Sequence, residues 1–166
     1  MKLLRNLALA AVTAVSIMSP AMARVESGTV DLMEGLAANG IKVTINQNCD
    51  GTAYGTYSFA GMKRVMHLCP GDTVDAIDHE TVRHEAIHAI QHCVNVGRGT
   101  PINDPVLSYG ELRDLVNTHL SVERVNWIKE TYPESHWLVE FEANVMADIA
   151  TADEILEFFT EACVGG

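Results

Sequence analysis

Near its middle the chain reads Thr81-Val82-Arg83-His84-Glu85-Ala86-Ile87-His88-Ala89-Ile90-Gln91-His92. No Gly or Pro occurs from Asp72 to Val96, which favours a helix over this stretch. His84 and His88 are four positions apart, so on a helix they lie about 40° apart around the axis and about 6 Å apart along it. Two imidazoles at this spacing can point at one metal ion.

The neighbours of the two histidines fit the same interpretation. Glu85 is turned about 100° from His84, so it would miss the metal but can reach a water molecule on it. His92 lies about 12 Å along the axis from His84, too far to share its metal, and is expected at the rim. Another face is apolar or small and is predicted to pack into the core: Ala86, Ile87, Ala89, Ile90, Cys93 and Val94.

Residues 1–23 are predicted to be a signal peptide. Lys2 and Arg5 give a positive start, residues 7–18 are mainly apolar, and Ala21-Met22-Ala23 is a small-residue cleavage site. The apolar run is too short to span a membrane comfortably, and no second candidate follows. We therefore expect one domain over residues 24–166, secreted or periplasmic, without insertion into a membrane.

The charge of the chain limits its partners. Asp and Glu number 22 against 11 Lys and Arg, so the net charge is −11 at pH 7. Such a surface repels nucleic acid and anionic lipid, and neither is expected to bind.

The chain has four cysteines. An even number in an exported chain predicts two disulfides. Of the three possible pairings we favour Cys49–Cys69 and Cys93–Cys163. No C-x-x-C spacing supports a cysteine-ligated metal instead.

The remaining patterns predict an α+β fold, in which a small, mainly antiparallel sheet packs on the histidine-bearing helix and a helical half follows. A helix over 30–38 should end at Asn39-Gly40, and Asp72, Thr73 or Asp78 should cap the central helix. Strands are expected at 41–45, 54–59 and 64–68. A long loop over 97–110 should precede helices at 112–132, 134–150 and 152–163.

A catalytic zinc site usually has three protein ligands, so a third is sought downstream. His84-Glu85-x-x-His88 followed by a helical Glu140-x-x-Ala143-Asn144 resembles the gluzincin family of zinc metallopeptidases. The resemblance implies a zincin-like fold with His84, His88 and Glu140 as zinc ligands. It also implies that Asn144, where the family usually has Asp, accepts a hydrogen bond from a ligand imidazole.

Other third ligands stay open. Glu142 lies two positions from Glu140 and faces nearly the other way on a helix. Asp104 lies in a segment that loosely resembles the aspzincins, which bind zinc through an Asp. The metzincin arrangement is excluded, because its third histidine would stand where this chain has Val94.

The resemblance implies an exported zinc-dependent peptidase, an endopeptidase acting on proteins or peptides. Glu85 would be the general base that takes a proton from a metal-activated water. The substrate is expected along an edge strand at 64–68. Candidates for holding the oxyanion are Tyr109, His119, Tyr132 and His136.

Two other classes of function stay open. One is a non-catalytic secreted module whose metal site binds a protein partner. The other is a metal-dependent hydrolase of cell-wall peptide amides.

Overall fold

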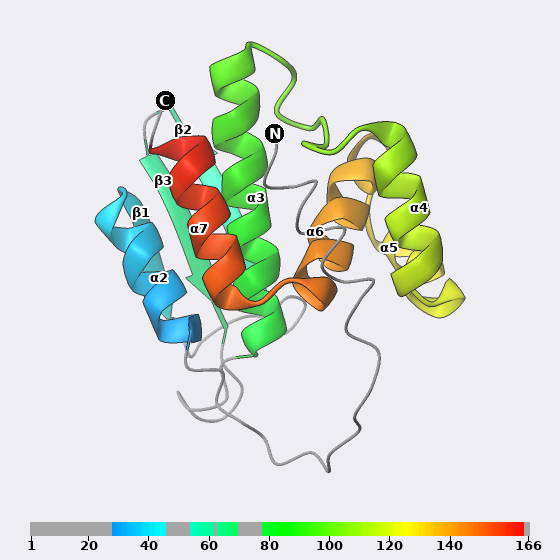
Figure 1. Ribbon diagram of the computed structural model, residues 1–166, viewed down its shortest axis with the longest axis horizontal. Helices are drawn as coiled ribbons and strands as arrows, with labels where there is room; N and C mark the ends of the chain where they lie inside the picture. Colours follow the sequence, from blue (N-terminus) through cyan, green and yellow to red (C-terminus); the bar gives the residue numbers. More distant parts are fainter. Residues whose placement is uncertain (1–27, 46–53, 62, 70–77, 165–166) are drawn as a thin grey trace.

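The computed structural model describes residues 28–45, 54–61, 63–69 and 78–164. Within these ranges the protein is α+β and mostly helical, with six α-helices, a short 3-10 helix and three strands (Figure 1). In chain order the elements are α2 (Gly28–Ala38), β1 (Ile41–Ile45), β2 (Gly55–Ala60), β3 (Lys63–Leu68), α3 (His79–Arg98), α4 (Tyr109–His119), α5 (Val122–Thr131), η2 (Glu134–His136), α6 (Trp137–Ile149) and α7 (Ala152–Cys163).

The sheet is mixed, with strand order β1-β3-β2. β2 and β3 form an antiparallel hairpin that pairs Tyr57 with Met66, whereas β1 runs parallel to β3 and pairs Val43 with Met66. The prediction of a mainly antiparallel sheet was therefore wrong. The hairpin fixes only the direction of β3 relative to β2. It does not fix the direction of β1, which pairs with the other edge of β3 and runs parallel to it.

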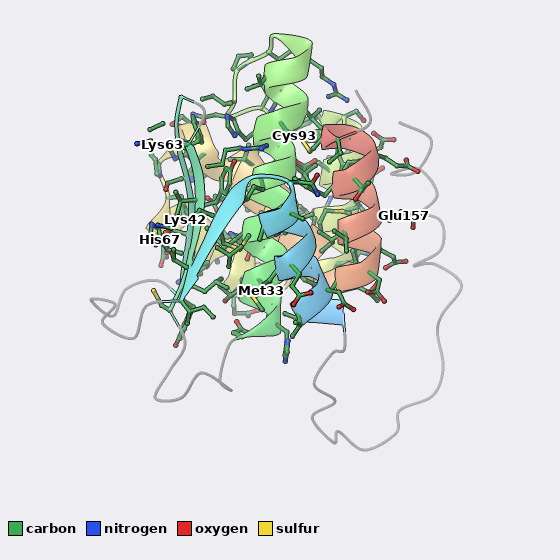
Figure 2. The ribbon with its side chains drawn as sticks, turned by 90° about the vertical axis from the view of Figure 1, so that its left-hand side faces the viewer. Met33, Lys42, Lys63, His67, Cys93 and Glu157 are labelled. Atoms are coloured by element: carbon green, nitrogen blue, oxygen red, sulfur yellow. A yellow bond between two sulfur atoms is a disulfide. The ribbon has the colours of Figure 1, made fainter. Side chains whose placement is uncertain are left out.

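The predicted substrate strand at 64–68 is also corrected, because β3 is the central strand and its two edges are paired. Met66 and Leu68 on β3 are fully buried, which explains why this strand takes the centre of the sheet. Lys42, Lys63 and His67 lie on the side of the sheet away from the helices (Figure 2). β2 is the edge strand that contacts α3.

Helix α3 lies in the middle of the fold. The sheet, α2 and α7 pack on one side of it, and α6 packs on the other (Figure 1). Asp78, one of the three residues predicted as alternative caps, is its N-cap. The Asp78 side chain accepts hydrogen bonds from Glu80 N and Thr81 Oγ1. Gly99 ends the helix at φ 67°, a left-handed conformation that costs glycine no steric penalty. Ala86, Ile87, Ala89 and Ile90 are buried, so these four residues of the predicted apolar face enter the core, whereas Cys93 and Val94 are partly buried.

The helical half contains one more break than expected. Residues 112–132 were predicted as one helix but form α4 and α5, separated at Leu120 and Ser121. Ser121 caps α5 by accepting a hydrogen bond from Arg124 N. A serine that bonds the backbone in this way favours a new helix start over continuation of the previous helix. The predicted loop shortens to Gly99–Ser108 because α3 continues to Arg98.

Cys93 on α3 and Cys163 on α7 form the predicted disulfide pair, with Cα atoms 5.7 Å apart. The predicted Cys49–Cys69 pairing involves Cys49, which lies outside the described residues, as does the predicted signal peptide at 1–23. No helix among the described residues has both the length and the apolar character needed to cross a membrane.

Candidate metal centre

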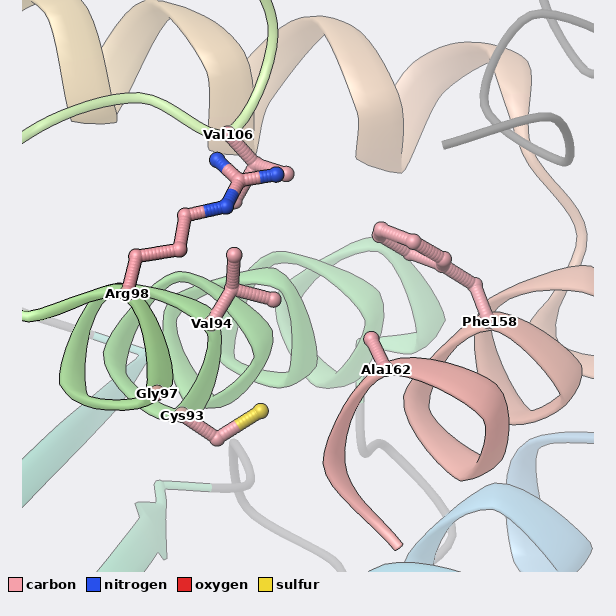
Figure 3. A pocket seen from close by; sticks show the side chains of 7 residues that line it. All are labelled: Cys93, Val94, Gly97, Arg98, Val106, Phe158 and Ala162. Carbon is pink, nitrogen blue, oxygen red and sulfur yellow. The ribbon is translucent and has the colours of Figure 1, made fainter. Parts of the chain in front are cut away.

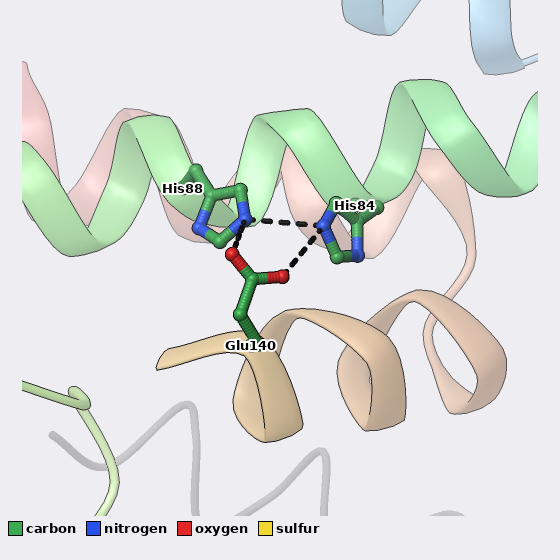
Figure 4. A group of neighbouring side chains, drawn as sticks. All are labelled: His84, His88 and Glu140. Carbon is green, nitrogen blue, oxygen red and sulfur yellow. Dashed lines mark hydrogen bonds and ion pairs between the residues drawn. The ribbon is translucent and has the colours of Figure 1, made fainter. Parts of the chain in front are cut away.

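Helices α3 and α6 bring three potential metal ligands together, His84, His88 and Glu140 (Figure 4). The two histidine Nε2 atoms lie 3.1 Å apart. Glu140 Oε2 lies 3.4 Å from His84 Nε2, and Oε1 lies 3.5 Å from His88 Nε2. The structure thus joins the two histidines of the sequence motif to the carboxylate that the resemblance selected.

These distances fit a metal ion. Ligand atoms bound tetrahedrally at 2.0–2.1 Å from zinc are about 3.3 Å from one another, close to the distance between the two Nε2 atoms and to the distance from each Nε2 atom to one of the Glu140 oxygens. Glu140 Oε2 is buried and has no hydrogen-bond partner among the described residues. A buried carboxylate oxygen without a partner is costly, and a bound cation would satisfy it. The group can therefore hold a metal ion.

Without a metal, the protonation of His88 and that of Glu140 depend on each other. Burial disfavours a charged His88, but the hydrogen bond and negative charge of Glu140 outweigh it and raise the pKa of His88 to about 9. Burial alone would raise the pKa of Glu140, but the imidazoles of His84 and His88 outweigh this effect and lower it to about 2. In the metal-free protein an imidazolium therefore takes the place of the cation.

Glu85 lies beside the group on the side of the sheet. Its side chain is buried, and its carboxylate accepts a hydrogen bond from the backbone of Tyr57 on β2. Burial raises the pKa of Glu85, and the nearby His84 and His88 oppose that shift. Gly55 on β2 lies directly against the Glu85 side chain. The predicted general base is thus close to the candidate ligands and held by the edge strand.

Tyr132 is the predicted oxyanion candidate that the structure brings to the group. It follows α5, is half-buried, and lies close enough to Glu140 and Glu85 to feel their charges. Burial and the charges of Glu140 and Glu85 raise the pKa of Tyr132 well above its ordinary value. Tyr109 is instead 66% exposed at the start of α4. His119 and His136 are not part of the metal-binding group found among the described residues.

The predicted role of Asn144 is corrected. Its amide accepts a hydrogen bond from Arg124 Nε and donates one to the backbone oxygen of Glu140, and neither bond reaches an imidazole. The partner of His88 is Gln91, whose Oε1 lies 2.8 Å from His88 Nδ1. Sequence analysis missed Gln91, although its position three residues after His88 on one helix gave the signal.

The alternative third ligands lie elsewhere. Glu142 is buried, and it accepts hydrogen bonds from Gln91 and from the backbone of Val106 and Leu107. Burial raises the pKa of Glu142, and these donors oppose the shift. Asp104 is exposed in the loop after α3, outside the metal-binding group of the described residues. Glu142 and Asp104 are therefore not placed to bind this metal.

His92 lies at the rim, as expected, one turn beyond His88. Its Nδ1 is 2.8 Å from the Tyr57 hydroxyl, and its ring stacks on Phe59 with centroids 4.0 Å apart. Burial and the charge of Arg64 lower the pKa of His92. Together these side chains pack β2 against α3.

A separate pocket of about 260 Å³ opens between α3, α7 and the loop after α3 (Figure 3). Phe158 and Ala162 line it from α7, and Arg98 reaches over it from the end of α3. It contains none of the candidate metal ligands and no general base. We assign no chemistry to this pocket.

No protein-family model, curated protein or solved structure matches this chain. The geometry of the metal-binding group is therefore the basis for inferring a function.

Proposed function

We propose that this protein is an exported, zinc-dependent peptidase. The observation that carries the proposal is the convergence of His84, His88 and Glu140, with Glu85 buried beside them. A purely structural metal site has no need of a carboxylate next to its ligands, whereas hydrolysis by an activated water needs a general base there.

The donor set favours zinc. His84 Nε2, His88 Nε2 and a Glu140 oxygen would hold the ion, and two imidazoles with one carboxylate are a common ligand set of catalytic zinc. Bound zinc supplies two kinds of chemistry, a lowered pKa for a water molecule and polarisation of the substrate carbonyl.

The side chains around the group have distinct roles in this proposal. Glu85 accepts a proton from the attacking water and delivers it to the leaving nitrogen. Its raised pKa makes the Glu85 carboxylate a stronger base than an exposed glutamate. The Tyr132 hydroxyl donates a hydrogen bond to the substrate carbonyl oxygen as negative charge develops there. A peptide would lie along the edge of β2, next to Glu85.

Metal analysis combined with activity assays tests the proposal. We expect about one zinc per chain in the wild type, and its loss in Glu140→Gln. Asp148→Asn is a matched control, because Asp148 is an exposed carboxylate on the same helix. Glu85→Gln should retain zinc but lose hydrolysis, since only the proton transfer is removed.

Three kinds of substrate are tested in the activity assay: folded proteins, unfolded peptides and peptidoglycan. Cleavage of proteins or peptides is the expected result. Cleavage of peptidoglycan alone would redirect the proposal to cell-wall amides. Zinc without any hydrolysis would favour a non-catalytic binding module, and absence of zinc from the reconstituted wild type would refute the metal centre.

A further inference from the structure

A buried chain of hydrogen bonds runs from His88 away from the metal group. His88 Nδ1 contacts Gln91 Oε1 at 2.8 Å, and Gln91 Nε2 contacts Glu142 Oε2 at 2.8 Å. Gln91 and Glu142 are each only 2% exposed. These hydrogen bonds thus link α3 to α6, starting from the imidazole nitrogen of His88 that does not face Glu140.

The partners of Gln91 fix the orientation of its amide. Its Nε2 contacts the Val139 backbone oxygen at 3.0 Å as well as the Glu142 carboxylate, and both of these groups accept hydrogen bonds. The nitrogen must therefore face them, which leaves Oε1 facing His88. An amide oxygen only accepts, so Gln91 calls for a hydrogen on Nδ1, which leaves Nε2, the nitrogen that faces Glu140 Oε1 at 3.5 Å, to bind a metal ion.

Glu142 holds the far end of this chain. Oε2 also accepts a hydrogen bond from Val106 N at 2.9 Å, and Oε1 accepts one from Leu107 N at 2.6 Å. Both oxygens thus face N–H donors, and they tie α6 to the loop between α3 and α4. Burying a carboxylate is expensive, and apolar residues often replace such groups at little cost when only packing is needed.

We infer that Gln91 and Glu142 are positioning residues for His88, which they hold as the Nδ1–H tautomer with Nε2 directed at the metal group. Their role in metal binding rests on the proposed function, whereas their control of the tautomer does not. Glu142 orients Gln91, and Gln91 orients the imidazole. The same carboxylate couples His88 to the backbone of Val106 and Leu107.

Asn95 provides a matched control for Gln91. It is a buried amide on the same helix, one turn beyond Gln91, and it also ties down the loop, since Asn95 Nδ2 donates to Asp104 O at 2.7 Å. Its other bond, from Thr100 Oγ1, does not reach His88 either. Asn95→Leu should therefore weaken the loop contacts without releasing the imidazole.

The test measures zinc affinity, by competition with a chelator, in Gln91→Met, Glu142→Gln and Asn95→Leu, with urea unfolding for each. We expect Gln91→Met to lower zinc affinity about 10–100-fold. Glu142→Gln should lower it too, because a glutamine in either orientation turns its NH₂ group toward an N–H donor. Asn95→Leu should lose stability but bind zinc as the wild type does. Unchanged affinity in a folded Gln91→Met, or an equal loss in Asn95→Leu, would overturn the inference.

Histidine-ring NMR of the metal-free full chain carrying Glu140→Ala gives a second readout, at a pH high enough for neutral rings. This variant removes the carboxylate that faces His88 Nε2 at 3.5 Å and would also attract the hydrogen. We expect Nδ1–H for His88 in Glu140→Ala and a mixture of tautomers when Gln91→Met is added. An Nε2–H tautomer in Glu140→Ala would refute the inference even if the double variant does not fold. A wild type that binds no zinc, together with Nδ1–H in Glu140→Ala, would refute the metal centre and leave the positioning role intact.

Discussion

Gly55 and Glu85 are in direct contact between β2 and α3. A β-carbon placed on Gly55 would lie 3.0 Å from Glu85 Cγ, 3.2 Å from Glu85 Oε1 and 2.5 Å from Thr81 Cγ2. The edge strand therefore lies so close to α3 that a side chain at residue 55 would collide with Thr81 and crowd Glu85. The position of the Glu85 carboxylate depends on the absence of a side chain at residue 55.

Gly55→Ala should displace Glu85 while leaving the metal ligands in place. A shift of about 1 Å in a catalytic group can lower the rate on the order of 10²-fold. We expect a kcat reduced to that extent and a zinc content unchanged from the wild type. Gly97→Ala is the control, because a β-carbon there meets nothing within 4 Å, and alanine should stabilise the helix by about 0.5–1 kcal/mol. An active Gly55→Ala would show that Glu85 tolerates the displacement.

Tyr132→Phe removes the hydroxyl but keeps the ring. If this hydroxyl holds the developing negative charge, kcat should fall about 10²–10³-fold, while KM and zinc affinity stay close to the wild-type values. Steady-state kinetics on a peptide substrate measure the two parameters. The exposed Tyr109 supplies the matched control, Tyr109→Phe, which should behave as the wild type. A rise in KM at constant kcat would assign Tyr132 to substrate binding instead.

Zinc affinity should rise steeply with pH. Zinc requires a neutral His88, whose pKa in the metal-free protein is about 9, so below pH 9 a proton must leave before the metal binds. We expect about a tenfold gain in affinity per pH unit up to that value. Without Glu140 the gain would end at a lower pH, because burial then opposes the charged form of His88. Titration calorimetry in buffers of different ionisation enthalpy counts the released proton, and a flat profile from pH 7 to 9 would contradict this expectation.

The pair Cys93 and Cys163 should stabilise the fold by cross-linking α3 to α7. A disulfide that closes a loop with a sequence separation of 70 residues typically contributes about 2–4 kcal/mol. We expect the double variant Cys93→Ser with Cys163→Ser to lose stability in that range, measured by urea unfolding. Zinc content should persist in the folded variant, because neither sulfur belongs to the metal-binding group. Equal stability with and without the pair would mean that the helix packing alone holds α7.

Most element positions were predictable because their signals are local. The apolar spacing on α3, the alternation in the strands and the Asn39-Gly40 helix end each depend on a few neighbouring residues. The missed break at Ser121 is local as well, but a single serine cap competes with good helix formers on both sides. The strand order was not predictable, because it depends on the burial of Met66 and Leu68 of β3 in the core, which requires packing against helices far away in the sequence.

By itself, the sequence determined the spacing of His84 and His88 on one helix, because the geometry of a helix sets the distance between residues i and i+4. The sequence also limited the third ligand to a few carboxylates. Only the tertiary structure brought Glu140 to the histidines, turned Glu142 toward Gln91 and replaced Asn144 by Gln91 as the partner of His88. These contacts depend on the rotation of α6 against α3, and the packing of two helices fixes that rotation through side chains that are far apart in the sequence.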